Sequence, residues 1–326
     1  MKHFFREGLF MIHTRKPGAF FCLVFFLYAS LNAGVRSYET MHTYEFFTSE
    51  FATDNVGTEA LAYKLLKNDP LHASVSYVAI PWAVLINKKQ LDKVEKLNLR
   101  IENGFAICQH IKYEDIIPLL KKIGVKTLFT PHAILGKVYE GIDVVAFPHV
   151  AANGIEGAIN KDIWYSFIGC SNTHPVRKII FTMQHPANTI IIERKNWHWA
   201  NAFKPGSASI DQQQVEALEY QEALARSRFS LCPRGTGAST IRFWESLQAG
   251  AIPVLFADAM TLPEGFDWES CVVKIAEKDV QSIGKRLSSI SPKREAIMRK
   301  QCIQAYNLFS EENFVRCIRL YFGDRI

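Results

Sequence analysis

The chain has 326 residues, which is enough for two domains that each bury a core of their own. Its composition, 48% hydrophobic and 21% charged, is that of a globular protein. The net charge of +6 is dispersed without a run of five or six basic residues, so a nucleic-acid role has little support, whereas anionic small ligands suit a mildly basic surface. Seven cysteines without Cys-x-x-Cys spacing indicate neither a zinc site nor a disulfide framework.

Residues 1–40 have the pattern of a signal peptide or a signal anchor. Basic side chains dominate residues 1–16, and residues 19–33 are almost entirely apolar and carry no charge. The uncharged stretch 17–35 is barely long enough to cross a bilayer. We therefore expect either a cleaved peptide or a membrane anchor, with a buried core element as the alternative. The charge bias keeps the N-terminus cytosolic and sends the rest of the chain across the membrane.

The first half, 41–158, alternates predicted helices with predicted strands, which indicates a parallel sheet covered by helices. Asp69-Pro70 ends the first helix, and Pro81 interrupts the first apolar run. Helices are expected over 58–67 and 113–123, and strands over 75–85, 105–108, 126–129 and 143–146.

The second half shows the same alternation from about Lys161 onward. Residues 185–214 are polar, aromatic and irregular, so we expect a loop there. The last helix is expected to return to the first half of the chain. Strands are predicted over 165–169, 229–231 and 271–275, and helices over 215–226, 280–287, 292–309 and 312–321.

Residues 229–256 form the most informative stretch, because they predict one strand–loop–helix–strand unit. The apolar strand meets a breaker cluster at 233–237. A helix should start near Ser239, with Ser239 or Thr236 as its cap, and should end at Gly250 in a left-handed C-cap.

Charged side chains gather at the start of this helix. Arg234 lies in the loop, and Arg242 and Glu245 lie three residues apart on one helix face. A loop with Gly235 and Gly237 that leads into a helix N-terminus suits phosphate oxygens, and arginine adds bidentate contacts. Glu245 could accept hydrogen bonds from a ribose or sugar diol. The pattern predicts a sugar-nucleotide diphosphate site; the alternative is a solvated ion pair beside an ordinary turn.

Two other nucleotide-binding motifs are absent. The loop lacks the Gly-Lys-Ser/Thr of a Walker A motif, and Thr240 stands where a dinucleotide fingerprint needs its third glycine. A nicotinamide-dependent oxidoreductase would also give α/β alternation, but its fingerprint is missing. No Asp-x-Asp occurs, so a metal held by that motif is not predicted and no cofactor is expected.

At these residues the sequence resembles the exostosin family of glycosyltransferases. The family's pattern combines a Pro-x-Gly loop, an Arg-x-x-Glu helix start preceded by a serine, and a Gly-Cys-Ile-Pro-Val strand. Three positions depart from it, Cys232, Ala251 and Glu264, and they look like packing positions. The matching residues are Ser227, Phe229, Leu231, Pro233, Gly235, Ser239, Arg242, Glu245, Gly250, Ile252, Pro253, Val254, Asp258, Leu262, Pro263, Asp267 and Trp268.

Fainter similarity extends to both sides of this stretch. Residues 68–81 and Asp143-Val144-Val145 with Pro148 resemble family segments of the first half. Residues 165–169, followed by Arg177, are similar to the family's Phe-Ser-Phe-x-Gly strand with a downstream arginine, and Tyr220 stands where the family has a tyrosine.

The resemblance implies a GT-B-like pair of Rossmann-type α/β domains facing a cleft. It implies an acceptor-side domain over 41–158, a donor-binding domain over 159–300 and C-terminal helices over 301–326 packed near the cleft. The expected activity is inverting, metal-independent transfer of a hexosyl or pentosyl group from a nucleotide sugar, such as a UDP-sugar, to a glycan or glycoconjugate hydroxyl.

The resemblance also implies roles for individual residues. Arg234, Arg242 and the backbone at Gly235 are expected to hold the diphosphate, and Glu245 the ribose or donor sugar. Ser239 and Arg177 are further donor-binding candidates, although Arg177 equally suits a structural pairing role. The donor-binding residues are therefore Arg234, Gly235, Ser239, Arg242, Glu245 and Arg177.

An inverting transfer needs a general base on the acceptor side. His132, in Thr-Pro-His at the end of a predicted strand, and His110, in Cys-Gln-His, are the catalytic candidates, with His149 and Asp115 less favoured. The alternative is a non-catalytic exostosin-like protein that binds a glycan or a nucleotide sugar without transferring it.

The expected location follows from where nucleotide sugars occur. A translocated enzyme of this kind points to a eukaryotic secretory compartment of the Golgi type, where it would contribute to polysaccharide biosynthesis or glycosylation. A bacterial chain would keep its body on the cytoplasmic face of the inner membrane. No Asn-x-Ser/Thr sequon occurs, which slightly weakens the luminal expectation.

Overall fold

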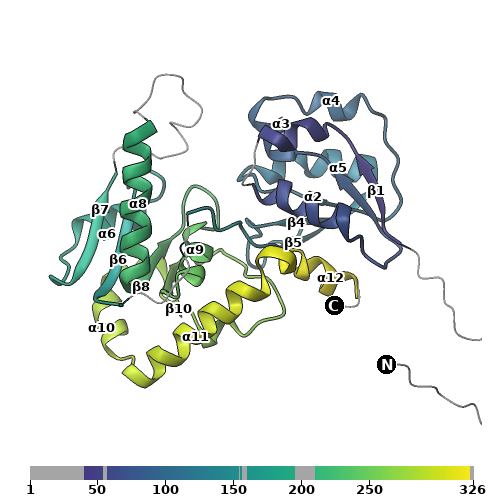
Figure 1. Ribbon diagram of the computed structural model, residues 1–326. Coiled ribbons are helices and arrows are strands. Elements are labelled where there is room, and N and C mark those ends of the chain that lie inside the picture. The colour runs from purple at the N-terminus through teal and green to yellow at the C-terminus, as the bar shows by residue number, and fades with distance from the viewer. Residues whose placement is uncertain (1–39, 54–56, 154, 156–159, 195–209, 324–326) are drawn as a thin grey trace, which may run out of the picture. The chain divides into compact units, whose positions relative to one another are not determined.

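The computed structural model describes residues 40–53, 57–153, 155, 160–194 and 210–323 (Figure 1). The predicted signal or anchor segment therefore lies outside the described residues, apart from its last position. Within the described ranges the strands form two five-stranded sheets, and every strand pair is parallel. The predicted α/β class with parallel sheets is confirmed.

The first sheet contains its strands in sequence order. Alternate side chains along each strand enter two different hydrophobic clusters, as the period of two of a β-strand requires. Tyr77, Ala79, Phe105 and Ile107 belong to the cluster that includes α2 (Thr58–Asn68). Val78, Ala106 and Leu128 belong to the cluster of α3 (Trp82–Asn87) and α5 (Ile117–Ile123). The strands are β1 (His42–Glu45), β2 (Ser76–Ala79), β3 (Gly104–Ile107), β4 (Val125–Thr130) and β5 (Asp143–Ala146).

The helices of this half follow the predicted alternation. The expected helix over 113–123 is present, with its first turn in the tighter 3-10 form, and Gly124 ends it with φ of +92°. The helical elements are η1 (Thr48–Thr53), α2 (Thr58–Asn68), α3 (Trp82–Asn87), α4 (Asp92–Glu95), η2 (Tyr113–Ile116) and α5 (Ile117–Ile123).

The apolar run 75–85 was expected to be one interrupted strand, and that prediction is wrong beyond Pro81. The strand β2 ends at Ala79, Pro81 occupies the N-cap position, and the helix α3 begins at Trp82. Proline has no N–H for a sheet ladder, whereas its fixed φ is compatible with the start of a helix. The apolar residues after Pro81 therefore reach the core from a helix and not from a strand.

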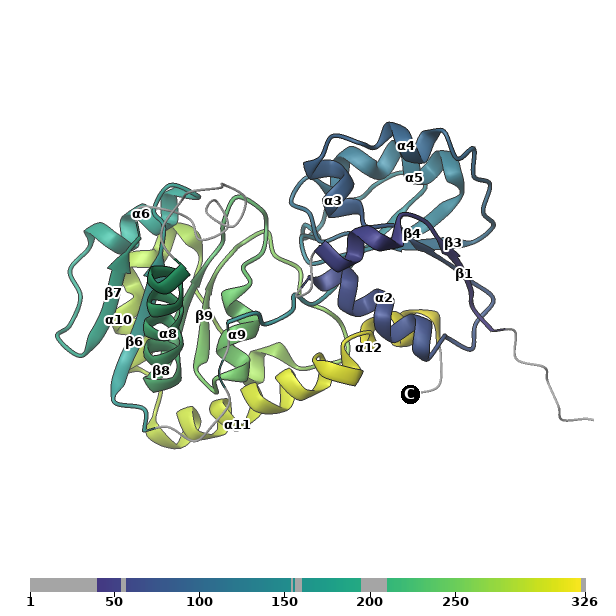
Figure 2. The same cartoon turned by 45° about the horizontal axis from the view of Figure 1, so that its top comes forward.

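The second sheet has the strand order β10-β9-β8-β6-β7. Figure 2 shows α8 lying across β6 and β8, the two strands that it contacts. The helices α9 and α11 also pack on this sheet. The strands are β6 (Ile163–Gly169), β7 (Thr189–Glu193), β8 (Ser227–Pro233), β9 (Ile252–Phe256) and β10 (Val273–Lys274), and the helices are α6 (Pro175–Thr182), α8 (Ile210–Arg226), α9 (Arg242–Gln248), α10 (Ile283–Ser288) and α11 (Pro292–Leu308).

The prediction of an irregular loop over 185–214 is wrong at both of its ends. Residues Thr189–Glu193 form the edge strand β7, which pairs with β6 along its whole length, and α8 already begins at Ile210. The Thr-Ile-Ile-Ile run is β-branched throughout and therefore favours a strand. Residues 195–209 lie outside the described ranges.

The predicted unit around Ser239 is present, with a shorter helix than expected. The helix α9 starts at Arg242, and its N-cap, Ile241, has no side-chain capping hydrogen bond. The hydroxyl of Ser239 is instead bonded to two histidines. Gly250 has φ of +61°, which confirms the left-handed C-cap.

The C-terminal helix α12 (Arg316–Phe322) follows the 3-10 turns η4 (Glu277–Ser282) and η5 (Glu311–Asn313) in the chain. The ring of Phe322 lies 5.2 Å from that of Phe105 and 6.0 Å from that of Phe129, both in the first sheet. Arg319 pairs with Asp69 at 2.7 Å. The end of the described chain therefore contributes to the core of the first sheet.

Candidate functional site

The candidate site lies where the strand order of the second sheet reverses. The chain passes from β6 to β7 on one side and then to β8 on the other side of β6. In open α/β sheets, ligands bind outside the carboxyl ends of the strands at such a reversal. The first sheet has its strands in sequence order and offers no equivalent point.

Arg177 on α6 joins the loops that follow β6 and β8. Its Nε donates to the Arg234 carbonyl at 2.8 Å and its Nη2 to the Pro233 carbonyl at 3.2 Å. The guanidinium carbon also lies 5.7 Å from the centre of the Phe167 ring. Arg177 therefore fixes the start of the glycine loop at the reversal point.

Arg234 and Gly235 form the entry to this loop. Arg234 Nε donates to the Gly237 carbonyl at 3.1 Å, and the Gly235 amide donates to the Ser239 carbonyl at 3.4 Å. A Cβ on Gly235 would lie in van der Waals contact with the Arg177 guanidinium, at 3.5 Å from its Nη2. The loop is thus folded back on itself beside two arginine side chains.

Arg242 is held between two aromatic rings. Its guanidinium carbon lies 4.7 Å from the centre of the Phe167 ring and 5.0 Å from that of Tyr220. Its Nη2 donates to the Ile168 carbonyl. Its Nε is buried without a hydrogen-bond partner among the described residues, which is a costly state for a charged group.

The three arginines form a cluster of positive charge. Burial, followed by the neighbouring charge of Arg242, lowers the pKa of Arg177 to about 10. The three guanidiniums donate hydrogen bonds to backbone carbonyls, and in the described part of the chain none of the three forms a salt bridge with a carboxylate. A bound anion would relieve this like-charge repulsion.

Glu245 lies one turn further along α9 and is buried, with 4% of its surface exposed. Its Oε1 accepts a hydrogen bond from the Asn153 amide at 2.9 Å, and its Oε2 accepts one from the Tyr220 hydroxyl at 2.5 Å. The alternative interpretation, a solvated ion pair between Arg242 and Glu245, does not occur among the described residues. The carboxylate is instead oriented by two neutral donors.

Ser239 connects the glycine loop with two histidines that follow strands of the first sheet. Its Oγ lies 2.9 Å from His132 Nδ1 and 3.0 Å from His149 Nε2, and all three side chains are buried. Burial lowers the pKa of His132 to about 4 and that of His149 well below its usual value. Both rings are therefore neutral at pH 7. His149 was the less favoured candidate, but the structure places it beside His132.

Gly237 allows the His132 ring to approach the loop. A Cβ at this position would lie 2.5 Å from His132 Nδ1 and 2.9 Å from Ile111 Cγ2, which is closer than real Cβ contacts. A glycine is thus needed here for space and not for a positive φ. The sequence indicated Gly237 as part of a phosphate-binding loop, or of an ordinary turn, but not its contact with His132.

His110, the second predicted base, lies outside this group of contacts. Its Nε2 is 3.0 Å from Asn87 Oδ1, and its Nδ1 accepts a hydrogen bond from the Lys112 amide at 3.0 Å. Burial and the Lys112 charge lower the pKa of His110, while the Asp115 charge raises it in part. Both nitrogens of this ring are therefore engaged.

Sequence reasoning missed Glu59, a buried carboxylate at the start of α2. Its oxygens accept hydrogen bonds from the Gln109 amide at 2.8 Å and from the Ala83 amide at 3.1 Å. It therefore ties together the segments that follow β2 and β3. The sequence does carry a signal for a buried carboxylate here. Glu59 lies on the same helix face as the buried Ala62 and Leu66, where a charged residue is unusual.

The described residues contain neither a metal-binding cluster nor a membrane-spanning helix. No group of three or more His, Cys, Asp or Glu side chains in these ranges is arranged to hold a metal ion. No helix in the described part of the chain is long and apolar enough for a membrane span.

Comparison with known proteins finds similarity over the part of the chain that carries most of this site. The family model "Exostosin GT47 domain" matches residues 135–290. The chain is 37% identical over 101 residues to "Exostosin-1 homolog" of Caenorhabditis elegans, covering 30% of this chain and 26% of that protein. It is 40% identical over 88 residues to "Probable beta-1,4-xylosyltransferase IRX10" of Arabidopsis thaliana, covering 26% of this chain and 21% of that protein.

The chain thus spans about a quarter of the length of these relatives. Among solved structures, the pneumococcal O-GlcNAc transferase GtfA in complex with UDP and GlcNAc matches with a TM-score of 0.41 and 8% identity, covering 85% of this chain and 59% of that one.

Proposed function

Because residues 135–290 match the family model "Exostosin GT47 domain", we propose that the chain is a glycosyltransferase that uses a nucleotide-sugar donor. The observation that carries the proposal is the cluster of Arg177, Arg234 and Arg242, which has backbone carbonyl partners and lies at the strand-order reversal. A diphosphate would satisfy the buried Arg242 Nε and offset the repulsion within the cluster.

The proposed donor is a UDP-sugar, with its diphosphate on the three arginines and the Gly235 amide, and with Ser239 at the edge of the loop. Glu245 is proposed to accept hydrogen bonds from the ribose. The arginines would stabilise the leaving diphosphate, which is the charge that develops during transfer. The proposed acceptor is a glycan or glycoconjugate hydroxyl that receives a hexosyl or pentosyl group.

We propose an inverting reaction with His132 as the general base. The ring is neutral above a pH of about 4, so a nitrogen lone pair exists at neutral pH. Its Nδ1 is hydrogen-bonded to Ser239, and the ring also bonds the Gln109 backbone. Proton uptake from an acceptor therefore requires one of these bonds to open. The anomeric configuration of the product, measured by NMR, tests the stereochemistry.

One observation favours the alternative of a non-catalytic exostosin-like binder. The rings of His132 and His110 are both engaged within the protein, so neither offers a free lone pair in this structure. Binding of UDP-sugars without release of UDP in the presence of varied glycan acceptors would identify the binder. An enzyme would be identified if the wild type releases UDP in the presence of an acceptor, and if H132Q still binds UDP but no longer turns over.

The site itself is tested by Arg242→Ala, measured by calorimetry with UDP. Loss of charge-assisted hydrogen bonds worth about 1.5–3 kcal/mol should weaken UDP binding about 10- to 100-fold and abolish transfer. Arg100→Ala is the matched control, because Arg100 also donates to a backbone carbonyl but lies outside the cluster. Equal UDP affinity in wild type and R242A would refute the site.

UDP binding that is unchanged in the presence of EDTA is expected for the proposed metal-independent reaction.

We also propose that the protein acts in a secretory compartment of the Golgi type, attached to the membrane through residues 1–40. The basic and apolar pattern of that segment supports the proposal. Carbonate extraction and protease protection of the tagged full chain in eukaryotic microsomes test it. Release by carbonate, or digestion without detergent, would contradict it.

A further inference from the structure

One tyrosine touches both of the charged residues that α9 presents to the site. The Tyr220 hydroxyl donates to Glu245 Oε2 at 2.5 Å, and the Tyr220 ring lies 5.0 Å from the guanidinium carbon of Arg242. Tyr220 belongs to α8, whereas Arg242 and Glu245 belong to α9. The two contacts use different parts of the side chain, so substitution can separate them.

The hydroxyl contact fixes the direction of the Glu245 carboxylate. Burial, followed by the charge of Glu245, raises the pKa of Tyr220 well above its usual value, so the phenol remains a hydrogen-bond donor. The Asn153 amide donates to the other carboxylate oxygen. Each oxygen then retains acceptor capacity, and the pair of oxygens suits two adjacent hydroxyl groups, such as the 2′ and 3′ hydroxyls of a ribose.

The ring contact fixes Arg242. The guanidinium carbon lies 5.0 Å from the centre of the Tyr220 ring and 4.7 Å from that of Phe167. A cation held over aromatic faces is attracted by the negative face of each ring. A phenylalanine at position 220 would keep this contact and lose only the hydroxyl. A leucine would lose both.

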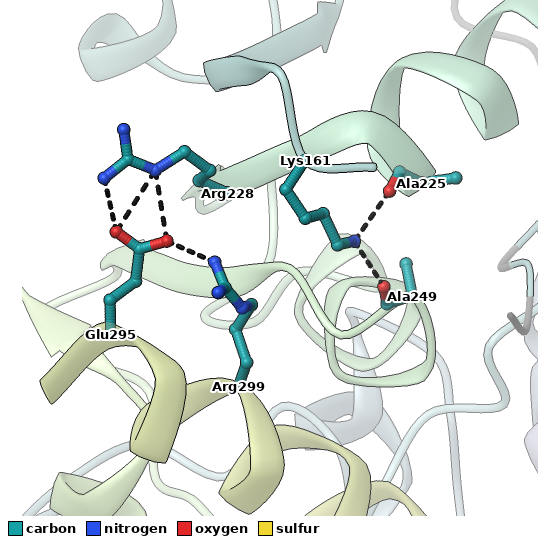
Figure 3. Close-up of polar contacts among 6 residues, drawn as sticks. All are labelled: Lys161, Ala225, Arg228, Ala249, Glu295 and Arg299. Atoms are coloured by element: carbon teal, nitrogen blue, oxygen red, sulfur yellow. Dashed lines mark hydrogen bonds and ion pairs between the residues drawn. The ribbon is translucent and has the colours of Figure 1, made fainter. Parts of the chain in front are cut away.

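The relative position of α8 and α9 is set by a third residue, Lys161 (Figure 3). Its Nζ donates to the Ala225 carbonyl in the last turn of α8 at 2.6 Å and to the Ala249 carbonyl at the C-cap of α9 at 2.7 Å. A cation is favourable at helix C-termini. Lys161 thus joins the two helices at their carboxyl ends and keeps Tyr220 next to α9.

We propose that Tyr220 is a positioning residue with two separable actions: its hydroxyl aims Glu245 at the ribose of the donor nucleotide, and its ring holds Arg242 for the diphosphate. The inference rests on the proposed function. It predicts that the site prefers ribonucleotides to deoxyribonucleotides, and that this preference depends on Tyr220 although Tyr220 does not itself contact the nucleotide.

The test is calorimetry of the full chain with three probes: UDP, 2′-deoxy-UDP and inorganic pyrophosphate. The variants are Tyr220→Phe and Tyr220→Leu. Tyr321→Phe is the matched control, because the Tyr321 hydroxyl also donates to a carboxylate, that of Asp143, at 2.8 Å. Thermal unfolding of each variant checks that it is folded.

Wild type and Y321F should bind UDP about tenfold more tightly than 2′-deoxy-UDP, and Y220F should bind the two equally while its pyrophosphate affinity is unchanged. Y220L should also lose about tenfold in pyrophosphate affinity. Two results would overturn the inference while leaving nucleotide binding intact. In the first, Y220F keeps the wild-type preference for UDP over 2′-deoxy-UDP. In the second, Y220F binds pyrophosphate and UDP more weakly than wild type by the same factor. Absence of UDP and pyrophosphate binding in wild type would overturn the proposed function and the inference with it.

Discussion

Ser239 Oγ lies 2.9 Å from His132 Nδ1, although the two residues are 107 positions apart in the chain. The same hydroxyl is 3.0 Å from His149 Nε2, so one serine serves two buried rings. Ser239→Ala would leave both nitrogens without this partner, and we expect a loss of about 1–3 kcal/mol in the free energy of unfolding. Urea denaturation measures it. Ser289→Ala, which removes an exposed serine hydroxyl, should change stability by less than about 0.5 kcal/mol.

Gly237→Ala should destabilise the protein because the added Cβ would lie 2.5 Å from His132 Nδ1. The ring is hydrogen-bonded and buried, so it has little room to move, and overpacking of this kind costs about 1–3 kcal/mol. Gly284→Ala is the control, since no atom lies within 4 Å of a Cβ there. That substitution should leave stability unchanged or raise it by up to about 1 kcal/mol. Equal melting temperatures for the two variants would show that the loop tolerates a side chain.

The stability of the protein should fall as the pH is lowered from 6.5 toward 4. His132 has a pKa of about 4 in the folded protein against 6.5 in an open chain, so the unfolded state binds more protons across this window. The stabilisation is fully present above pH 6.5 and is lost as the pH falls through about 4, which amounts to about 3 kcal/mol for this residue. Denaturation midpoints of wild type and His132→Gln over this range measure it, and the slope should be shallower in the variant. Parallel slopes would contradict the prediction.

Glu295→Gln should destabilise the second sheet, because Glu295 is the common partner of two arginines. Its side chain is 4% exposed and binds Arg228 on β8 and Arg299 on α11 (Figure 3). Both arginines are about one third exposed, so solvent screens part of the loss, and we expect about 1–3 kcal/mol. Glu222→Gln removes an exposed ion pair with Arg226 and should cost less than about 0.5 kcal/mol. Chemical denaturation of both variants makes the comparison.

The sequence predicted the α/β alternation and the position of the main motif, because both depend on local signals. Apolar periodicity identified α2 and most of the strands, and Gly250 marked the end of α9. The edge strand β7 was missed because its short apolar run stands between polar stretches. A strand at the edge of a sheet gives a weak pattern that only pairing with β6 resolves.

The partners of the site residues were not predictable, because each pair joins distant parts of the chain. Local spacing indicated that Arg242 and Glu245 share a helix face, but not that Tyr220 and Asn153 would take the carboxylate. Ser239 was interpreted as a helix cap because serine favours that position. Its actual partners, His132 and His149, follow strands of the other sheet and have no sequence signal for this contact.

The packing of Phe322 and Tyr321 against Phe129 has a consequence for biosynthesis. A nascent chain releases its N-terminal residues from the ribosome first, yet the aromatic core of the first sheet includes rings from the last helix. That sheet therefore completes its core only after translation has passed residue 322, and premature termination would leave its aromatic surface open to chaperones.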